Sequence, residues 1–495
     1  MIHIITIFKI KIVEPMKKYL SILLIAYALP LAQVNSQEVV KVSKADFKIQ
    51  EEGFKDAWKN IRDGNQLFNS GVGLYPQAVV CYLLANDYNS NNAELNYKIG
   101  VSYLFGLEPL KSVDFFRKSY ELNPDVTEDI LLLTGKAYQV RGDYGKAIDY
   151  YNMYSDKYHD AVSFNSQVNN LINQCNRAIE MLDEEKQAEI NNAGLNINSQ
   201  YDDYSPVLAN EDKLLYFTTR RAIDTKRIRQ DADMKWDENI YIATREGDGW
   251  NPAGPAGDEL TTILNEGVLS VVANGQLMYL YAGYEGNGDI LVSEFLNGAW
   301  SKPAQIDLKI NSKDRETSIS VTEDGNQIFF TSDMRKTIGK RDIFYIKRIS
   351  KNKWTKPFNL GEPVNTEQNE ESVYVSAGGD TIWFSSDRPG GIGGFDIYMS
   401  VKDDIGLWSE PDNLGVPANS QSNDLFYRPG VLNKNESWLA SDRPGGYGGF
   451  DIYRLIKSPP EEKPEKMTDD TLAIEADTLI VKPDTMNIRM NLSWH

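Results

Sequence analysis

Histidine and cysteine are scarce in this chain of 495 residues, which contains three histidines and two cysteines. The cysteines, Cys81 and Cys175, are too few for a disulfide framework or a cysteine-based zinc site. Beyond residue 36 the only histidines are His159 and His495, which leaves no Ser-His-Asp or Cys-His group for the repeats of the second half. No Gly-x-Ser-x-Gly, His-Glu-x-x-His or phosphate-binding loop motif occurs. We therefore expect no catalytic residues, no metal site and no cofactor.

Positive charge and long apolar segments are also in short supply. The formal net charge of −19 argues against general nucleic-acid binding. An apolar run over residues 19–32 follows Lys17 and Lys18 and precedes Ser36, which is the pattern of a secretory signal peptide over residues 1–36. The run is too short for a membrane span, and no second run follows it. We expect an exported protein of the periplasm, with outer-membrane association left open.

A segment of the second half occurs twice with one difference. Residues 386–398 read SDRPGGIGGFDIY, and residues 441–453 read SDRPGGYGGFDIY. Fainter copies of the Asp/Asn-Ile pair begin at Asn239, Asp289 and Asp342, and a Trp-Pro signature follows each of the first four copies. The period is about 50 to 55 residues, with several apolar strands in each unit, which indicates the blades of a β-propeller.

The ends of the repeat array predict how the propeller closes. The fifth unit lacks the Trp-Pro strand that ends the first four. The outer strand of most units ends in a pattern such as that of residues 361–366 or 415–420, and residues 194–199 have the same form but precede the first unit. We therefore expect an N-terminal strand to complete the last blade, because such closure removes an exposed sheet edge. The predicted propeller has five blades and spans residues 191–459.

A helical pattern precedes the propeller. A polar linker over residues 37–52 leads into apolar residues at helical spacing over residues 53–190, in which a glycine recurs at intervals of 36 and 35 residues and an aromatic residue follows each glycine. The glycines are Gly64, Gly100 and Gly135, and the aromatic residues are Tyr82, Phe116 and Tyr151. A small residue lets two antiparallel helices approach, and the aromatic ring fills the space between them. We expect an α + β multidomain chain: an α-solenoid of three helix pairs, capped by a helix over residues 161–190, and then the propeller.

These two patterns together resemble one protein family. The helical repeats are similar to tetratricopeptide repeats, and the blades with Ser-Asp-Arg-Pro-Gly-Gly-x-Gly-Gly-Phe-Asp-Ile-Tyr are similar to TolB-like (WD-repeat-like) propellers. Over residues 53–459 the chain looks like the PorE-like, OmpA-family envelope proteins of the type IX secretion and gliding machinery. The resemblance implies a non-enzymatic adaptor that binds envelope or secretion-system proteins.

The chain departs from that family after the propeller. No OmpA module follows residue 459, which leaves peptidoglycan binding in doubt, and residues 460–495 form a Pro- and Glu-rich tail that we expect to be disordered. Three Asp-Thr-Leu/Met triplets in this tail resemble acceptors for O-linked glycosylation, although a plain charged tail is the simpler interpretation. The candidate acceptors are Thr471, Thr478 and Thr485.

Basic side chains gather in the loops between the second and third strands of the blades, and acidic side chains gather in the loops between blades. Both kinds of loop emerge on the same face of a propeller. The charges either pair with one another or form a protein-docking face, and we keep both interpretations. The candidate docking residues are Arg220, Arg221, Arg227, Arg229, Lys235, Arg335, Lys340, Arg341, Arg388 and Arg443.

The glycine-rich segments themselves are predicted to be structural turns, with a ligand-facing rim as the alternative. Their glycines permit positive φ, and their aspartates can accept backbone hydrogen bonds. The predicted turn residues are Asp387, Asp396, Asp442 and Asp451.

The function that we predict is a non-enzymatic envelope scaffold. Two alternatives remain: a periplasmic glycan or small-ligand sensor that uses the propeller channel, and a carboxylate-dependent hydrolase in the same channel. The helical stack offers a second candidate surface, unless it packs against the propeller instead.

Overall fold

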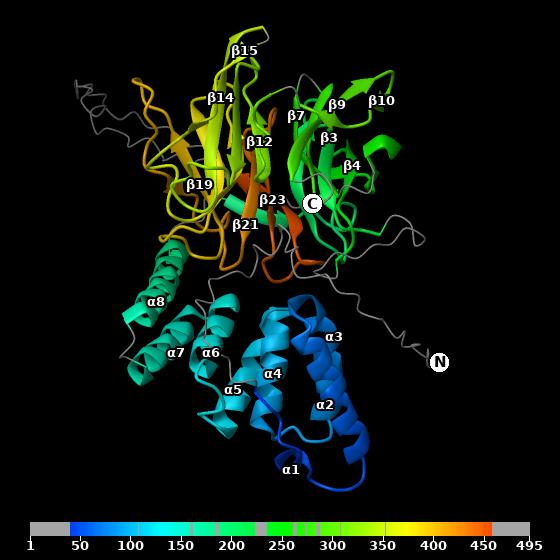
Figure 1. Ribbon diagram of the computed structural model, residues 1–495, viewed down its shortest axis with the longest axis vertical. Helices are drawn as coiled ribbons and strands as arrows, with labels where there is room; N and C mark the ends of the chain where they lie inside the picture. Colours follow the sequence, from blue (N-terminus) through cyan, green and yellow to red (C-terminus); the bar gives the residue numbers. More distant parts are fainter. Residues whose placement is uncertain are drawn as a thin grey trace, which may run out of the picture. The chain divides into compact units, whose positions relative to one another are not determined.

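The computed structural model describes residues 40–457, apart from 107, 159–161, 184–187, 223–234, 261–264, 273–274, 284–287, 307 and 352. The expected signal peptide, the tail and the candidate acceptors Thr471, Thr478 and Thr485 lie outside the described residues. Along the chain, a helical region precedes the strands (Figure 1). Within the described ranges, no helix combines the length and the apolar character that crossing a bilayer requires.

The helical region consists of one short helix, three helix pairs and one long helix. Its elements are α1 (Lys44–Phe47), α2 (Phe54–Asn69), α3 (Tyr75–Asn86), α4 (Ala93–Leu104), α5 (Ser112–Leu122), α6 (Ile130–Val140), α7 (Tyr144–Lys157) and α8 (Val162–Asp183). Helix α4 begins with the side chain of Asn92 accepting a hydrogen bond from the Leu95 N–H, which satisfies one of the amides left free at a helix N-terminus.

Each predicted glycine faces its predicted aromatic ring in the partner helix. A β-carbon added to Gly64 would lie 2.6 Å from the Tyr82 ring, and one added to Gly100 would lie 2.7 Å from the Phe116 ring. Gly135 has the same relation to Tyr151, also at 2.6 Å. The rings of Tyr82, Phe116 and Tyr151 are fully buried. The close approach of α2 to α3, α4 to α5 and α6 to α7 therefore depends on glycine at these positions.

We expect Gly135→Ala to destabilise the helical region by about 1–3 kcal/mol, because the added methyl group would overlap the Tyr151 ring in a filled core. Gly145→Ala is the matched control, since no atom lies within 4 Å of its added β-carbon. That control should be neutral or stabilising by up to about 1 kcal/mol, because Gly145 lies within α7. Thermal unfolding followed by far-UV circular dichroism measures both changes, and equal midpoints for the two variants would contradict the packing argument.

The strands form five antiparallel sheets, one for each blade. Blade 1 contains β2 (Asp203–Ala209), β3 (Leu214–Thr219), β4 (Asn239–Glu246), β5 (Gly249–Trp250) and β6 (Gly254–Pro255). Blade 2 contains β7 (Glu266–Val272), β8 (Leu277–Ala282), β9 (Asp289–Leu296), β10 (Ala299–Trp300) and β11 (Ala304–Gln305). Blade 3 contains β12 (Glu316–Val321), β13 (Gln327–Ser332), β14 (Asp342–Ser350), β15 (Lys353–Trp354) and β16 (Phe358–Asn359).

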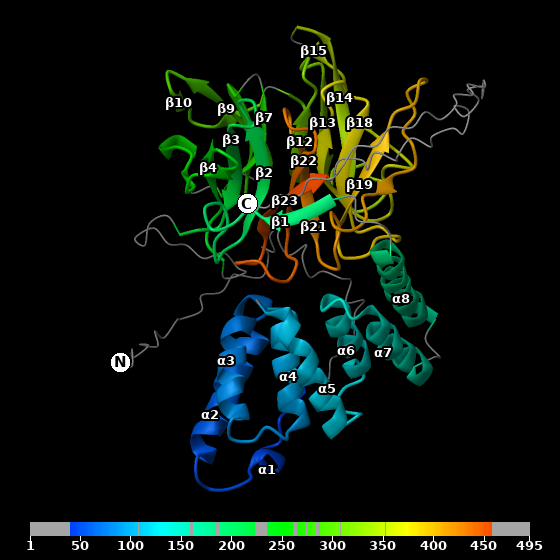
Figure 2. The same ribbon diagram turned by 180° about the vertical axis from the view of Figure 1, so that it is seen from behind.

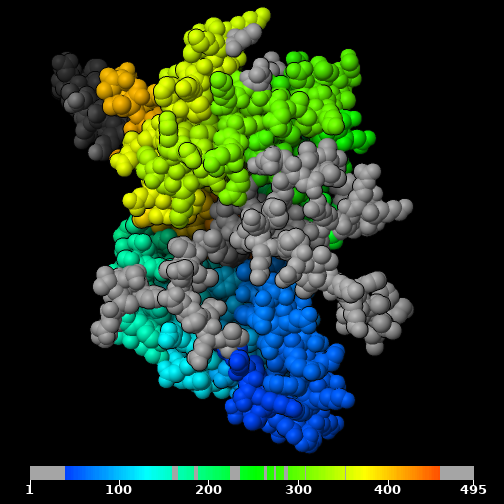
Figure 3. All heavy atoms as spheres, viewed as in Figure 1, coloured from blue at the N-terminus to red at the C-terminus, as the bar shows by residue number. Residues whose placement is uncertain are grey.

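The last two blades hold the near-identical segments. Blade 4 contains β17 (Glu370–Val375), β18 (Thr381–Ser386), β19 (Asp396–Val401) and β20 (Asp412–Asn413). Blade 5 contains β21 (Asp424–Pro429), β22 (Glu436–Ser441), β23 (Asp451–Lys457) and, from the other end of the propeller, β1 (Ala188–Asn192). The side chains of successive blades pack side by side, as the green to yellow surface in Figure 3 shows.

The predicted closure of the ring is confirmed, but the predicted bounds are not: α8 ends at Asp183, and the closing strand begins at Ala188, inside the range 161–190 predicted as a capping helix. Strand β1 pairs with β23 in antiparallel register, with Ile190 opposite Leu455, and so supplies the outer strand that blade 5 lacks (Figure 2). The innermost strands β2, β7, β12, β17 and β21 contact one another in sequence, and β21 contacts β2. The innermost strands therefore form a continuous ring that includes the junction of the last blade with the first.

Candidate functional site

The two glycine-rich segments form matching loops between the second and third strands of blades 4 and 5. In blade 4 the Asp396 carboxylate accepts hydrogen bonds from the Ile392 N–H, at 2.5 Å, and the Asn413 side chain, at 2.8 Å. In blade 5 Asp451 accepts the corresponding bonds from the Tyr447 N–H, at 2.6 Å, and from Asn192 in the closing strand, at 2.7 Å. These aspartates act as turn anchors, as their place in the sequence suggests, and also hold the outer strand.

The other two predicted turn aspartates tie each loop to its own innermost strand. Asp387 accepts bonds from the backbone and side-chain N–H groups of Asn369, at 2.8 and 3.0 Å. Asp442 accepts the same pair of bonds from Asn423, at 2.7 and 2.8 Å. Each asparagine directly precedes the first residue of an innermost strand. The two hydrogen bonds therefore position the loop relative to that strand.

Glycine allows each loop to pass directly against the next interblade segment. A β-carbon on Gly393 would overlap the carbonyl oxygen of Ser420, and one on Gly448 would overlap the carbonyl oxygen of Tyr201. Neither glycine has a positive φ, so the requirement is for space and not for a left-handed backbone. Blade 3 repeats this contact, with Gly339 against Thr366.

The arginines of the repeated segments point into the ring and not toward solvent. Arg388 is buried, donates to a Glu370 oxygen at 3.2 Å and to the Val364 carbonyl, and lies 5.1 Å from the centre of the Phe384 ring. In blade 5 the guanidinium of Arg443 lies 2.6 Å from Asp424. Arg388 and Arg443 thus join the motif loop to the first residue of the innermost strand of the same blade.

Four of the six other candidate docking residues that the structure describes are also engaged within the ring. Arg221 pairs with Asp203 at 3.1 Å and Lys235 with Asp202 at 2.6 Å, while Arg341 of blade 3 pairs with Glu371 of blade 4. Arg220 is buried and donates to the Trp236 carbonyl at 2.7 Å.

The predicted docking face is therefore much smaller than expected. Arg220, Arg341 and Arg388 are buried and do not belong to an exposed surface, because their charges are used to hold loops together. Arg335 and Lys340 are exposed, and Lys340 also donates to the Gln368 side chain at 3.0 Å. Arg227 and Arg229 lie outside the described residues.

Two aspartates of the motif loops hold protons more tightly than an ordinary carboxyl group. Burial, followed by the charge of Asp424, raises the pKa of Asp396 to about 7. Its buried Oδ1 atom has no hydrogen-bond partner among the described residues, which agrees with a protonated carboxyl group. Burial likewise raises the pKa of Asp442 to about 6. Both groups titrate near neutral pH because they are desolvated.

A side chain that the sequence did not reveal crosses the bore of the propeller. Arg428 lies in innermost strand β21, directly after a bulge at which Phe426 has a φ of 57°. Its guanidinium donates to the carbonyl of Ser372 in blade 4, at 3.5 Å, and to that of Leu269 in blade 2, at 3.4 Å. Burial lowers its pKa to about 10, and no carboxylate forms an ion pair with it in the described part of the chain. A bulge re-aims side chains, and only the folded ring shows where this one points.

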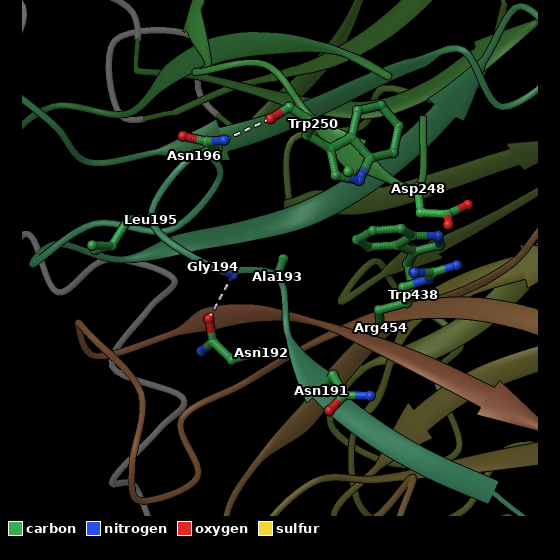
Figure 4. A pocket seen from close by; sticks show the side chains of 11 residues that line it. Asn191, Asn192, Ala193, Gly194, Leu195, Asn196, Asp248, Trp250, Trp438 and Arg454 are labelled. Atoms are coloured by element: carbon green, nitrogen blue, oxygen red, sulfur yellow. Dashed lines mark hydrogen bonds between the residues drawn. The ribbon is translucent and has the colours of Figure 1, made fainter. Parts of the chain in front are cut away.

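A cavity of about 470 Å³ lies where the closing segment joins blades 5 and 1. Figure 4 shows Trp250, Trp438 and Arg454 on one side of it and the turn after β1 on the other. The two indole rings meet edge to face, 5.6 Å apart, and Glu436 accepts from both Arg454 and the Trp438 N–H. Arg454 Nε in this wall has no hydrogen-bond partner among the described residues.

No known protein family and no curated protein matches the chain. Similar solved structures include a putative TolB from Agrobacterium tumefaciens, 15% identical over 51% of this chain and 76% of that one, with a TM-score of 0.31. A protein of unknown function from Dyadobacter fermentans is 12% identical over 55% of this chain and 100% of its own, with a TM-score of 0.36. The catalytic domain of an α-L-arabinofuranosidase from Coprinopsis cinerea is 12% identical over 52% and 92%, with a TM-score of 0.34. Such distant similarity concerns the fold and carries no argument about activity.

We expect Arg388→Met to destabilise the propeller by about 3–5 kcal/mol, because the change leaves Glu370 buried without its cation. Arg335→Met is the matched control in the equivalent loop of blade 3, where the side chain is exposed, and should change stability by no more than about 0.5 kcal/mol. Urea unfolding followed by tryptophan fluorescence measures both. Equal effects would show that the contacts of Arg388 with Glu370 and Val364 do not stabilise the propeller.

The raised carboxyl pKa values predict a stability that falls as the pH rises. An unfolded aspartate has a pKa of about 3.9, so between about pH 4 and pH 7 the folded protein holds a proton on Asp396 that the unfolded chain has lost. The free energy of unfolding should therefore decline across that window, and Asp396→Asn should flatten the decline. Asp442→Asn is the comparison, and its effect should end nearer pH 6. Urea unfolding at a series of pH values checks this, and a rise through the window that Asp396→Asn removes would contradict it.

Proposed function

We propose that this chain is a non-enzymatic adaptor of the bacterial cell envelope, which binds other proteins through the exposed loops of its propeller and through its helical region. The proposal places it in an assembly of the type IX secretion or gliding kind, in the periplasm or at the inner side of the outer membrane. The single observation that carries the adaptor role is that acidic residues of the innermost strands bind hydroxyl groups and an arginine of the propeller itself.

The innermost carboxylates have structural partners on every side. Glu370 accepts from the Thr366 and Ser386 hydroxyl groups, at 2.7 and 2.9 Å, and from Arg388. Glu316 accepts from the hydroxyl groups of Ser312 and Ser332, at 2.9 and 2.8 Å. A hydrolase of the carboxylate type needs a pair of acids facing a substrate, and a carboxylate surrounded by such donors is a poor general acid or base.

The bore of the propeller also favours the adaptor role over that of a small-ligand sensor. Arg428 spans it from blade 5 to carbonyl groups of blades 2 and 4, and the ring of Tyr374 lies 5.2 Å from its guanidinium. A ligand in the channel would have to displace these contacts. A ring whose bore is crossed by a buried arginine instead offers its rim and its outer loops for protein binding.

The helical region supports the proposed family setting. Its three glycine–aromatic pairs are the packing that tetratricopeptide repeats use, and such repeats bind partner chains. Together with the propeller, this is the arrangement that the PorE-like resemblance implies for residues 53–459.

Affinity purification of the tagged full chain from the envelope fraction of its source bacterium tests the adaptor role. We expect secretion or outer-membrane proteins to co-purify, and Arg335→Glu combined with Lys340→Glu to lower their recovery, because these side chains are exposed on the charged face. Lys353→Glu, at an exposed site in β15, is the matched control and should leave recovery unchanged. Recovery of no such protein with the unaltered chain would contradict the proposal.

A further inference from the structure

The two near-identical loops have the same backbone contacts and different surroundings. In both, the aspartate that begins the third strand holds the N–H of the variable residue, which is Ile392 in blade 4 and Tyr447 in blade 5. Gly391 in blade 4 lies against Asp396 and the Tyr398 hydroxyl group. Gly446 in blade 5 lies against Asp451 and the Tyr453 hydroxyl group in the same way. The loops therefore present the same shape, and any difference in what covers them comes from other parts of the chain.

The blade 4 loop is covered by α8 of the same chain. Ile392 is fully buried in the core cluster of the helical region, together with Cys175 and Ala178. The Gln174 side chain donates to the Gly393 carbonyl at 3.1 Å, and a β-carbon on Gly390 would lie 2.8 Å from an Arg177 nitrogen.

One face of α8 makes all of these contacts. Gln174, Arg177, Ala178 and Met181 lie at i, i+3, i+4 and i+7, which is one stripe of a helix. Met181 continues the contact to Gly415, where an added β-carbon would lie 3.8 Å from its sulfur. The loop thus receives an amide and a guanidinium from α8, and the adjacent interblade segment receives a flexible apolar side chain from the same helix.

The described residues place no helix over the blade 5 loop, although a β-carbon added to Gly449 at its end would lie 3.9 Å from the Lys235 ammonium group. Tyr447 is 49% exposed where Ile392 is 0% exposed, and a β-carbon added to Gly445 would meet nothing within 4 Å. No donor among the described residues reaches the carbonyl of Gly448, which corresponds to the carbonyl that Gln174 uses in blade 4.

We propose that the blade 5 loop, residues 443–449, is a docking site for an amphipathic helix of a partner protein, which presents a glutamine amide, an arginine three residues later and a methionine-like side chain four residues after that. The argument for this occupant comes from the same chain: a loop that differs at one position and shares its backbone contacts already binds such a helix in blade 4. Tyr447 in place of isoleucine adds a ring with a polar tip, a residue type enriched at protein interfaces. The inference deepens the proposed adaptor role and rests on it.

The equivalent loop of blade 3 is not a third copy of the site. Ile338 has the position of Tyr447, and its N–H donates to Asp342 in the same way. Lys336, however, stands at the position of Gly390 and Gly445 and also has a positive φ. A second lysine, Lys340, lies four residues later in the same loop. Two cations there would repel the arginine of an incoming helix, so this loop provides a control within the same protein.

The test uses a fluorescent, helix-stabilised peptide of residues 162–183 as the probe, added to the full chain, in which α8 already occupies blade 4. We expect saturable binding by fluorescence anisotropy, weakened at least about tenfold by Tyr447→Arg, because the new cation would face the arginine of the probe. Ile338→Arg in the full chain should leave probe affinity unchanged. A probe carrying Arg177→Glu should bind the Tyr447→Arg chain better than the unaltered probe does.

Three results would overturn the inference: no binding of the probe, binding that Tyr447→Arg leaves unchanged, or an equal loss with Ile338→Arg. Thermal unfolding of each variant shows whether a loss reflects misfolding, and rescue by the Arg177→Glu probe proves that a variant retains its site.

Failure of this inference differs from failure of the adaptor role. If envelope proteins co-purify equally with the unaltered chain and with Tyr447→Arg while the probe does not bind, the blade 5 site falls and the adaptor role stands. If the probe binds but no envelope protein co-purifies, the helix-binding site stands and the adaptor role falls.

Discussion

A buried carboxylate at the start of an innermost strand is the interaction on which the propeller depends. In blade 4 this group is Glu370, which joins the interblade loop through Thr366, the second strand through Ser386 and the motif loop through Arg388. Burial of a charge is costly unless its partners are all present, so the three segments must be in place together. Asp424 repeats the arrangement in blade 5 through Ser420 and Arg443, and Asp203 repeats it in blade 1 through Ser199 and Arg221.

These ion pairs explain why the most conspicuous charges of the sequence stabilise the fold and are not exposed at the surface. The basic residues with the strongest sequence signal, Arg388 and Arg443, belong to the two near-identical segments and are used inside the ring. Among the described residues discussed above, Arg335 and Lys340 in blade 3 and Tyr447 in blade 5 are exposed. The variable residue of the repeated segment is buried under α8 in blade 4, where it is Ile392, and is exposed in blade 5, where it is Tyr447.

Features with a short-range cause were predictable. The glycine–aromatic pairs follow from helix packing, and the turn aspartates follow from the preference of carboxylates for nearby N–H groups. The sequence left open whether Arg388 would pair with an acidic side chain or face a partner protein, and the structure shows the pair, because Glu370 and Val364 lie in other segments. The bore arginine Arg428 gave no signal, since its contacts with Ser372 and Leu269 exist only after the ring has closed.

By itself, the sequence determined the five blades, the borrowed closing strand and the paired helices, because periodicity and the placement of small residues are local properties of the chain. Tertiary structure alone decided which charges meet solvent, how the bore is filled and that α8 covers the loop of blade 4 and leaves that of blade 5 exposed. Those outcomes depend on segments hundreds of residues apart, such as Gln174 and Gly393, which 219 positions separate. Contacts across such distances follow from how whole elements pack, and no local pattern encodes them.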